Sequence, residues 1–164
     1  MPWIENVAAA DIPTGFHHDA GVNAMLIQIM DNDTTWWPEP KHQFKEIYKF
    51  KFLDIEKDDH CIDPAMKISD TQAEELVHLL QHAFENRMNV VVHCMAGICR
   101  SGAVCEIGVM MGFNDTERFR SPNLLVKHKM MKALGWTYDE KEEIRHRPYM
   151  YQPDENPTWP GDER

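Results

Sequence analysis

The sequence lacks any apolar segment long enough to cross a membrane as a helix. Such a helix needs roughly 20 consecutive, mostly apolar residues, and no run in the chain approaches that length. The N-terminal residues Met1–Asn6 also lack the basic stretch, followed by an apolar one, that marks a secretory signal. We therefore expect a cytoplasmic protein with no membrane association.

Positive charge is scarce. Lys and Arg total 17 residues against 27 Asp and Glu, which gives a formal net charge of −10 at pH 7. A surface that binds the phosphate backbone of a nucleic acid, or anionic lipid, needs many basic side chains. The composition therefore argues against a nucleic-acid partner, but it is compatible with one phosphate bound in a local positive pocket.

Cysteine is scarce as well, with four in the chain. Cys94, Cys99 and Cys105 fall within twelve positions around one motif, and a chain of 164 residues does not need disulfides to fold. We expect these three thiols and Cys61 to be reduced. The histidines do not show the paired ligand spacing of a zinc site, so we expect no metal or other cofactor.

The chain shows no internal repeat and no linker that would divide it. We expect one domain over residues 1–148, followed by an extended tail over 149–164 that is rich in proline and acidic residues. Apolar or alternating segments at 25–30, 47–53 and 89–92 predict strands. Between and after them, helical patterns begin near positions 69, 103 and 121. Strands alternating with helices indicate an α/β fold with a central parallel or mixed sheet flanked by helices.

Two of the expected helices carry end signals. Thr71 and Glu74 have the spacing of a capping box, and an apolar face with a period near 3.6 residues follows them. The third helix is expected to start at Ser121-Pro122-Asn123, with the proline near its first turn, and to end at Gly135.

The most informative segment is 90–102, which reads Val-Val-Val-His-Cys-Met-Ala-Gly-Ile-Cys-Arg-Ser-Gly. An apolar strand here delivers Cys94 into a short turn that is closed by the start of a helix at Arg100-Ser101. Backbone N–H groups of the turn, the helix N-terminus and the Arg100 guanidinium together form a site for an anion such as phosphate. The segment therefore predicts an anion site with a nucleophile in its floor.

These residue types suggest a two-step reaction without a metal. A thiolate of Cys94 attacks phosphorus, Arg100 and the loop amides stabilise the charge on the phosphoryl oxygens, and a carboxylic acid protonates the leaving oxygen. Water then hydrolyses the phosphocysteine, with the Ser101 hydroxyl easing departure of the sulfur.

The pattern His-Cys-x-x-Gly-x-x-Arg-Ser resembles the signature of the cysteine-based protein tyrosine phosphatases, in particular a compact, bacterial-like branch of the dual-specificity type. The likeness extends to Phe52-Leu-Asp-Ile, to the helix at 71–88 and to Pro122-Asn123. It covers roughly residues 22–136, whereas the first twenty residues carry none. The resemblance implies that Cys94 is the nucleophile, Arg100 the phosphate clamp and Ser101 the helper in the second step. It also implies a group of residues that surround the substrate phosphate: His93, Met95, Ala96, Gly97, Ile98 and Cys99.

The family's general acid follows a strand, some thirty to forty residues before the cysteine. Asp54 directly follows the expected strand at 47–53 and lies in the Phe-x-Asp-Ile context, so it is the preferred candidate. Asp58, Asp59 and Asp63 in the same loop remain alternatives.

The resemblance implies phosphotyrosine as substrate, with phosphoserine and phosphothreonine as further substrates, in a phosphorylated protein or a small phosphomonoester. Two alternatives remain open: a catalytically silent module that binds phosphate or a phosphoprotein, and a phosphatase for a nucleotide or an RNA 5′ end. An oxidoreductase would more naturally show Cys-x-x-Cys. Cys99, Cys61 or Cys105 is a candidate partner of an oxidised Cys94 in a regulatory disulfide. The sequence does not indicate an oligomeric state.

Overall fold

A computed structural model of the 164-residue chain describes residues 1–57 and 61–136. Five strands form one sheet: β1 (Trp3–Ala8), β2 (Ala24–Met30), β3 (Glu46–Lys51), β4 (Asn89–Cys94) and β5 (Asn114–Asp115). Their order across the sheet is β3-β2-β4-β1-β5, and every neighbouring pair is parallel. The predicted α/β class is confirmed, with a parallel rather than a mixed sheet.

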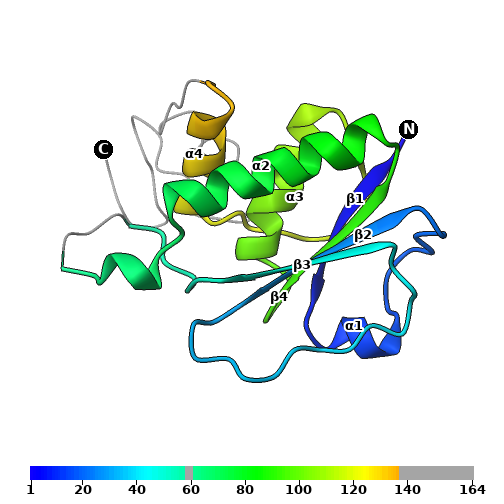
Figure 1. Cartoon of the computed structure of the whole chain (residues 1–164), viewed down its shortest axis with the longest axis horizontal. Coiled ribbons are helices and arrows are strands. Elements are labelled where there is room, and N and C mark those ends of the chain that lie inside the picture. The colour runs from blue at the N-terminus through cyan, green and yellow to red at the C-terminus, as the bar shows by residue number, and fades with distance from the viewer. Residues whose placement is uncertain (58–60, 137–164) are drawn as a thin grey trace, which may run out of the picture.

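Helices cover both faces of this sheet (Figure 1). On one face lie α2 (Asp70–Glu85), α3 (Arg100–Met111) and α4 (Leu124–Ala133), and α3 packs against both β1 and β4. The short α1 (Asp11–Thr14) lies on the opposite face, and a 3₁₀ turn (Pro64–Met66) precedes α2. The expected tail at 149–164 lies outside the described residues.

The core is divided by the sheet into two apolar clusters. Ile27, Ile29 and Val92 belong to the larger cluster beneath α2, α3 and α4, whereas Leu26 and Val91 belong to the smaller one on the α1 side. Successive side chains of a strand point to opposite faces, so β2 and β4 are buried on both sides. This double burial explains why their sequences are continuous apolar runs rather than alternating ones.

The strand β1 was missed by the sequence analysis. It lies between β4 and β5, and its last residue, Ala8, is in register with Cys94. Glu5 and Asn6 interrupt its apolar pattern, although both are buried, at 1% and 0% exposure. The partners of the Glu5 carboxylate and of the Asn6 amide nitrogen lie far away in the sequence, so no local sequence pattern indicates them.

Several predicted boundaries shift. The capping box of α2 is formed by Ser69 and Gln72, not by Thr71 and Glu74, because the helix begins at Asp70. β3 ends at Lys51, two residues before the expected end, and α3 already begins at Arg100. The last helix begins at Leu124 with Asn123 as the N-cap residue, so Pro122 lies just before the helix and not in its first turn.

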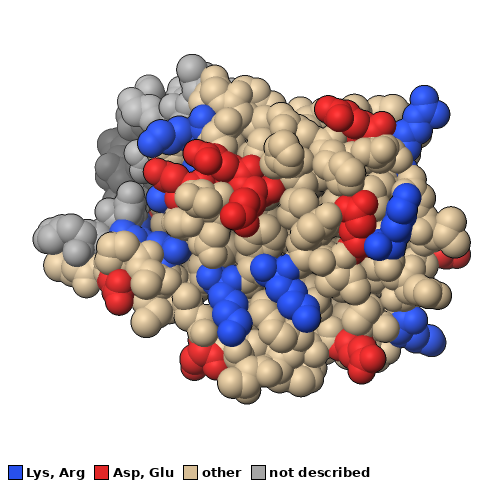
Figure 2. Space-filling view, viewed as in Figure 1, with Lys and Arg blue, Asp and Glu red and all other residues tan. Residues whose placement is uncertain are grey.

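The face shown in Figure 2 carries charges of both signs, and neither sign forms a continuous stripe on it. Acidic side chains gather over the first half of α2, where Asp70, Glu74 and Glu75 are exposed. In the part of the chain that the structure describes, no helix is long and apolar enough to cross a membrane.

Candidate active site

The 95–99 loop joins the end of β4 at Cys94 to the start of α3 at Arg100. It lies at the carboxyl edge of the parallel sheet, where ligands of such folds usually bind. A cavity of about 500 Å³ opens at this edge. Three segments line the cavity, namely those that follow β2, β3 and β4, with the residues Asp31, Leu53, Asp54, Ile55, Cys94, Met95, Ala96, Cys99 and Arg100.

Cys94 lies at the wall of this cavity with its side chain almost completely buried, at 3% exposure. Its Sγ lies 3.1 Å from the Oγ of Ser101, so the hydroxyl can donate a hydrogen bond to the sulfur. Both residues adjoin the N-terminus of α3, whose free N–H groups carry a positive partial charge. The sulfur is therefore close to a hydroxyl donor and to a favourable dipole.

β1 holds one side of the 95–99 loop. The backbone N–H of Ala9 donates to the carbonyl of Met95 at 3.2 Å, and the side-chain amide of Asn6 donates to the carbonyl of Gly97 at 2.7 Å. Gly97 has a φ of +75°, and a Cβ there would lie 2.3 Å from the carbonyl carbon of Val7. No other residue type fits so close to β1, so the glycine of the motif is required by packing and by backbone conformation.

The segment before α4 holds the other side of the loop. The N–H of Ser121 donates to the carbonyl of Ile98 at 3.1 Å, and the N–H of Asn123 donates to that of Cys99 at 2.9 Å. Carbonyls of the loop are thus engaged by donors from outside it. Since these carbonyls point outward, the amide N–H groups are left for the concave side, which is the arrangement of an anion-binding nest.

Arg120 anchors that supporting segment. Its guanidinium donates to Glu106 at 2.7 and 2.9 Å and to Asp115 at 3.0 Å through two nitrogens. These charge-assisted bonds raise the pKa of Arg120 and lower that of Asp115. The buried Arg120 therefore ties the backbone next to Ser121 firmly to α3.

Arg100 is oriented by two acceptors. Its NH1 group donates to the Oδ1 of Asp31 at 2.7 Å and to the carbonyl of Phe52 at 2.8 Å. The side chain is 5% exposed, and its Nε is buried without a hydrogen-bond partner. A buried donor without a partner is costly, and a phosphate oxygen bound in the cavity would satisfy it. The unpartnered Nε therefore fits the predicted role of a phosphate clamp.

Asp54 faces the same cavity from the loop after β3. One of its oxygens accepts a hydrogen bond from the Asn123 side-chain amide at 2.6 Å, and the carboxyl group also contacts the Cys99 thiol. The Asn123 amide also donates to the carbonyl of Ile55 at 3.2 Å, and its Oδ1 caps α4. Asn123 therefore connects the Asp54 loop, the 95–99 loop and α4.

The other candidates for the general acid are placed differently. Asp63 does not line the cavity; its Oδ1 accepts from the backbone N–H of Ala65 and caps the 3₁₀ turn. Asp58 and Asp59 lie outside the described residues. Among the described candidates, only Asp54 reaches the cavity.

Four of the predicted site residues do not line the cavity: His93, Gly97, Ile98 and Ser101. His93 is fully buried below it, and its Nδ1 lies 3.4 Å from the carbonyl oxygen of Cys94. Burial and the nearby Arg100 charge lower the pKa of His93 to about 4, so its ring is neutral at pH 7. Its place is that of a core residue behind the loop.

Sequence reasoning missed Asp31 and Asn6, and it saw Asn123 only as part of a helix start. Asp31 had a detectable signal, since it directly follows an apolar strand and so belongs to the edge where the site lies. Asn6 had none, because its role depends on the missed strand β1.

Two of the other thiols, those of Cys99 and Cys105, have raised pKa values. Burial raises the pKa of Cys99 to about 11, with a further contribution from the Asp54 charge, and burial raises that of Cys105 to about 12. Cys105 donates to the carbonyl of Ile4, while Cys61 is exposed, and none of the four cysteines forms a disulfide within the described residues. Within residues 1–57 and 61–136, no group of three or more His, Cys, Asp or Glu side chains could hold a metal ion.

No protein-family model matches the sequence, and no curated protein matches it. The chain is similar in structure to a human tyrosine phosphatase-like serine/threonine/tyrosine-interacting protein, with a TM-score of 0.54, 16% sequence identity, and coverage of 82% of this chain and 93% of that one. Human DUSP28 gives a TM-score of 0.48 and 15% identity, with 88% of each chain covered. OH1 from the Orf virus, a tyrosine phosphatase, gives a TM-score of 0.45 and 22% sequence identity, with 68% of this chain and 57% of that chain covered.

The first of these similarities shows the fold. The chain shares its α/β fold with this tyrosine phosphatase-like protein, and the motif resemblance had implied such a fold. Because that neighbour is described as phosphatase-like and as an interacting protein, the fold alone does not separate catalysis from binding. Whether the chain catalyses a reaction or only binds a ligand must therefore be judged from the side chains that line the cavity.

Proposed function

We propose that the chain hydrolyses phosphomonoesters as a cysteine-dependent phosphatase of the dual-specificity type. One observation carries the proposal: Cys94, Arg100 and Asp54 line the same cavity. The Nε of Arg100 also has no hydrogen-bond partner. A module that only binds phosphate needs the guanidinium and the loop amides. It has no use for a nucleophile beside a hydroxyl donor or for the carboxyl group of Asp54 in the same cavity.

In the first step, the Cys94 thiolate attacks phosphorus, and a sulfur–phosphorus bond forms as the bond to the leaving oxygen breaks. The Arg100 fork and the loop amides stabilise the charge on the three equatorial oxygens. Asp54 gives its proton to the leaving oxygen. The dephosphorylated alcohol or phenol leaves, and phosphocysteine remains.

In the second step, a water molecule attacks the phosphocysteine. Asp54, now ionised, accepts the proton of that water. The sulfur leaves as a thiolate, and the Ser101 hydroxyl, 3.1 Å away, stabilises its negative charge with a hydrogen bond. Inorganic phosphate is released and Cys94 is regenerated.

We propose phosphotyrosine as the main substrate, with phosphoserine and phosphothreonine accepted in addition. The apolar side chains of Leu53, Ile55 and the half-exposed Met95 line the cavity beside the polar groups, and they offer contacts to an aromatic ring. The substrate would be a phosphorylated protein or a small phosphomonoester. Cysteines that form no disulfide, as within the described residues of this chain, are typical of a reducing compartment, and this supports a cytoplasmic location.

The test is hydrolysis of para-nitrophenyl phosphate in excess EDTA under reducing conditions. We expect turnover by the wild type, none by Cys94→Ser, and a reduced rate for Asp54→Ala. Cys61→Ser, which changes an exposed cysteine outside the cavity, is the matched control and should retain full activity. If the wild type is inert yet inorganic phosphate protects Cys94 from iodoacetate, the chain is a phosphate-binding module.

A further inference from the structure

Asn6 is a polar residue in the centre of the sheet, with no exposed surface. It lies on β1 opposite Val92 of β4, and its neighbours Ile4 and Val7 belong to the two apolar clusters. Placing an amide in such surroundings costs free energy unless its polar atoms find partners. The bonds that Asn6 makes therefore account for its presence.

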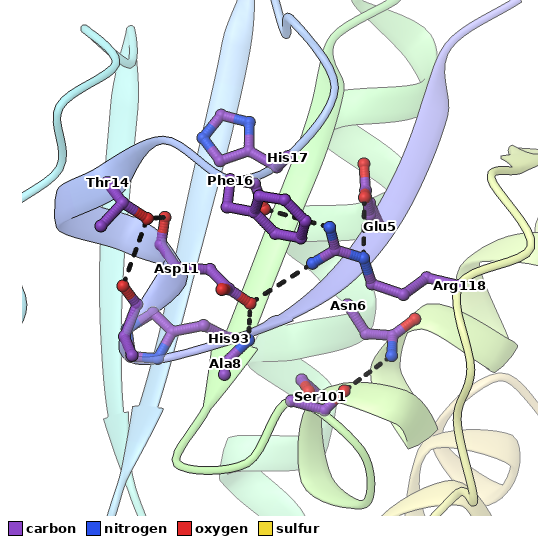
Figure 3. A network of polar contacts seen from close by, with 12 residues as sticks. Glu5, Asn6, Ala8, Asp11, Thr14, Phe16, His17, His93, Ser101 and Arg118 are labelled. Atoms are coloured by element: carbon purple, nitrogen blue, oxygen red, sulfur yellow. Dashed lines mark hydrogen bonds and ion pairs between the residues drawn. The ribbon is translucent and has the colours of Figure 1, made fainter.

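Both bonds of the Asn6 amide nitrogen go to backbone carbonyls distant in sequence. Its Nδ2 donates to Gly97 at 2.7 Å and to Phe119 at 2.9 Å. Gly97 belongs to the 95–99 loop, and Phe119 to the segment that supports this loop from the other side. Figure 3 shows the Asn6 side chain directed toward the loop beside Ser101. One amide thus joins the strand, the loop and its second support.

The Asn6 bond differs from the other outside contacts of this loop. Met95, Ile98 and Cys99 are held by backbone N–H groups, which a substitution does not remove. Gly97 is held by a side chain, and it is the loop residue with a positive φ. Without the donor, the Gly97 peptide is the one most free to rotate, and rotation would turn a carbonyl instead of an N–H toward a bound phosphate.

The neighbouring residue, Glu5, holds the second acceptor in place. Its buried carboxylate pairs with the Nε of Arg118 at 3.1 Å and with the Nδ1 of His18 at 2.7 Å. Arg118 also pairs with Asp11 at 3.4 Å, and the two contacts enclose its side chain (Figure 3). Because Arg118 precedes Phe119, this pairing keeps the Phe119 carbonyl within reach of Asn6.

We propose that Asn6 is a positioning residue for phosphate binding and catalysis. It holds the Gly97 carbonyl outward, and so it keeps the loop amides aimed at the phosphate. The proposal rests on the function proposed above. The active feature is the donor nitrogen, since the Oδ1 of Asn6 is buried without a partner. Asn6 acts through the loop and touches no reacting atom.

The test compares two replacements of similar size, Asn6→Leu and Asn6→Asp, on para-nitrophenyl phosphate from pH 5 to pH 8. Leucine has no donor, and we expect kcat/KM to fall about 10- to 100-fold at every pH, with a matching rise in the inhibition constant of inorganic phosphate. Aspartate donates only when protonated. The ratio of its kcat/KM to that of the wild type should therefore rise as the pH falls, a change that a general loss of packing would not produce.

Asn23→Ala is the matched control. The Asn23 amide also donates to two backbone carbonyls, those of Asn86 and Arg87, but it lies away from the cavity. We expect wild-type kinetics for this variant even if its melting temperature falls.

If the Asn6 variants fold and keep the wild-type kcat/KM and inhibition constant for phosphate, the positioning role is overturned. The proposed phosphatase activity is not affected by that result. Losses in Asn6→Asp and Asn6→Leu that are equal at every pH would also overturn the positioning role. If the wild type itself is inert, the proposed phosphatase fails. Protection of Cys94 from iodoacetate by inorganic phosphate then decides the role of Asn6, which is overturned if Asn6→Leu is protected as well as the wild type.

Discussion

Asp31 and Asp54 reach the same cavity from the ends of neighbouring strands, but their partners differ in charge. Asp31 follows β2 directly and accepts from the Arg100 guanidinium at 2.7 Å. Asp54 follows β3 and is held by neutral donors, the amide of Asn123 and the thiol of Cys99. The two carboxyl groups therefore serve different purposes.

A proton on Asp31 would remove its attraction to Arg100, so this residue is suited to holding the guanidinium in place. In the described residues, the Asp54 carboxyl group shows no contact with a cationic side chain and is held by the Asn123 amide instead. The comparison teaches that position at the sheet edge brings a carboxyl group to the site, whereas the charge of its partner decides what it does there.

Replacing Arg100 should lower kcat/KM more than any other change considered, because it removes the cationic partner that Asp31 has and Asp54 lacks. Lysine keeps the charge but has no planar fork, so it cannot contact Asp31, the Phe52 carbonyl and a phosphate at the same time. We expect Arg100→Lys to lower kcat/KM for para-nitrophenyl phosphate by about 10³-fold, as measured by steady-state kinetics. A loss below tenfold would contradict the clamp role.

The two carboxyl groups should respond differently to the leaving group. Asp54→Asn should lower kcat by about 10² to 10³-fold on phenyl phosphate, whose leaving oxygen needs a proton, and by much less on para-nitrophenyl phosphate. Asp31→Asn should lower kcat/KM on both substrates by a similar factor, because it disturbs Arg100. If Asp31→Asn shows the stronger leaving-group dependence, the two assignments must be exchanged.

Asn123→Ser should impair the role of Asp54 as general acid and leave the contact between Asp31 and Arg100 intact. Serine can still cap α4, but its short side chain cannot reach Asp54. We expect a loss of about tenfold in kcat on phenyl phosphate, a smaller one on para-nitrophenyl phosphate, and a nearly unchanged melting temperature. A large drop in melting temperature with intact kinetics would make Asn123 a residue of the fold alone.

Replacing His93 should affect the two carboxyl groups least, because its ring is buried outside the cavity. We expect it to change the pH dependence of the free energy of unfolding instead. The pKa of His93 is lowered from 6.5 to about 4 in the folded state, so between these values the unfolded state binds more protons. Stability from this group is complete above pH 6.5 and is lost as the pH falls, by up to ~3 kcal/mol near pH 4. Urea unfolding from pH 7 to pH 4.5 should show a weaker pH dependence for His93→Gln than for the wild type. Equal slopes would contradict the buried neutral ring.

Much of the fold could be predicted from local patterns. The apolar runs at β2 and β4 and the periodic face of α2 appear where such patterns indicate them, and α4 begins next to the expected helix start at 121–123. β1 could not be predicted, because Glu5 and Asn6 look like loop residues until their distant partners are known. Because β1 was not predicted, the hydrogen bonds by which Asn6 and Ala9 hold one side of the 95–99 loop were not predicted either.

The sequence by itself determined the strand–loop–helix that carries Cys94, Arg100 and Ser101, because all three lie within one short segment whose geometry is local. Only the tertiary structure decided how this segment is held and completed. Arg100 meets Asp31 across 69 positions, Asn6 meets Gly97 across 91, and Asn123 meets Asp54 across 69. Hydrogen bonds over such separations exist only once the sheet has brought their strands together, so no pattern along the chain contains them.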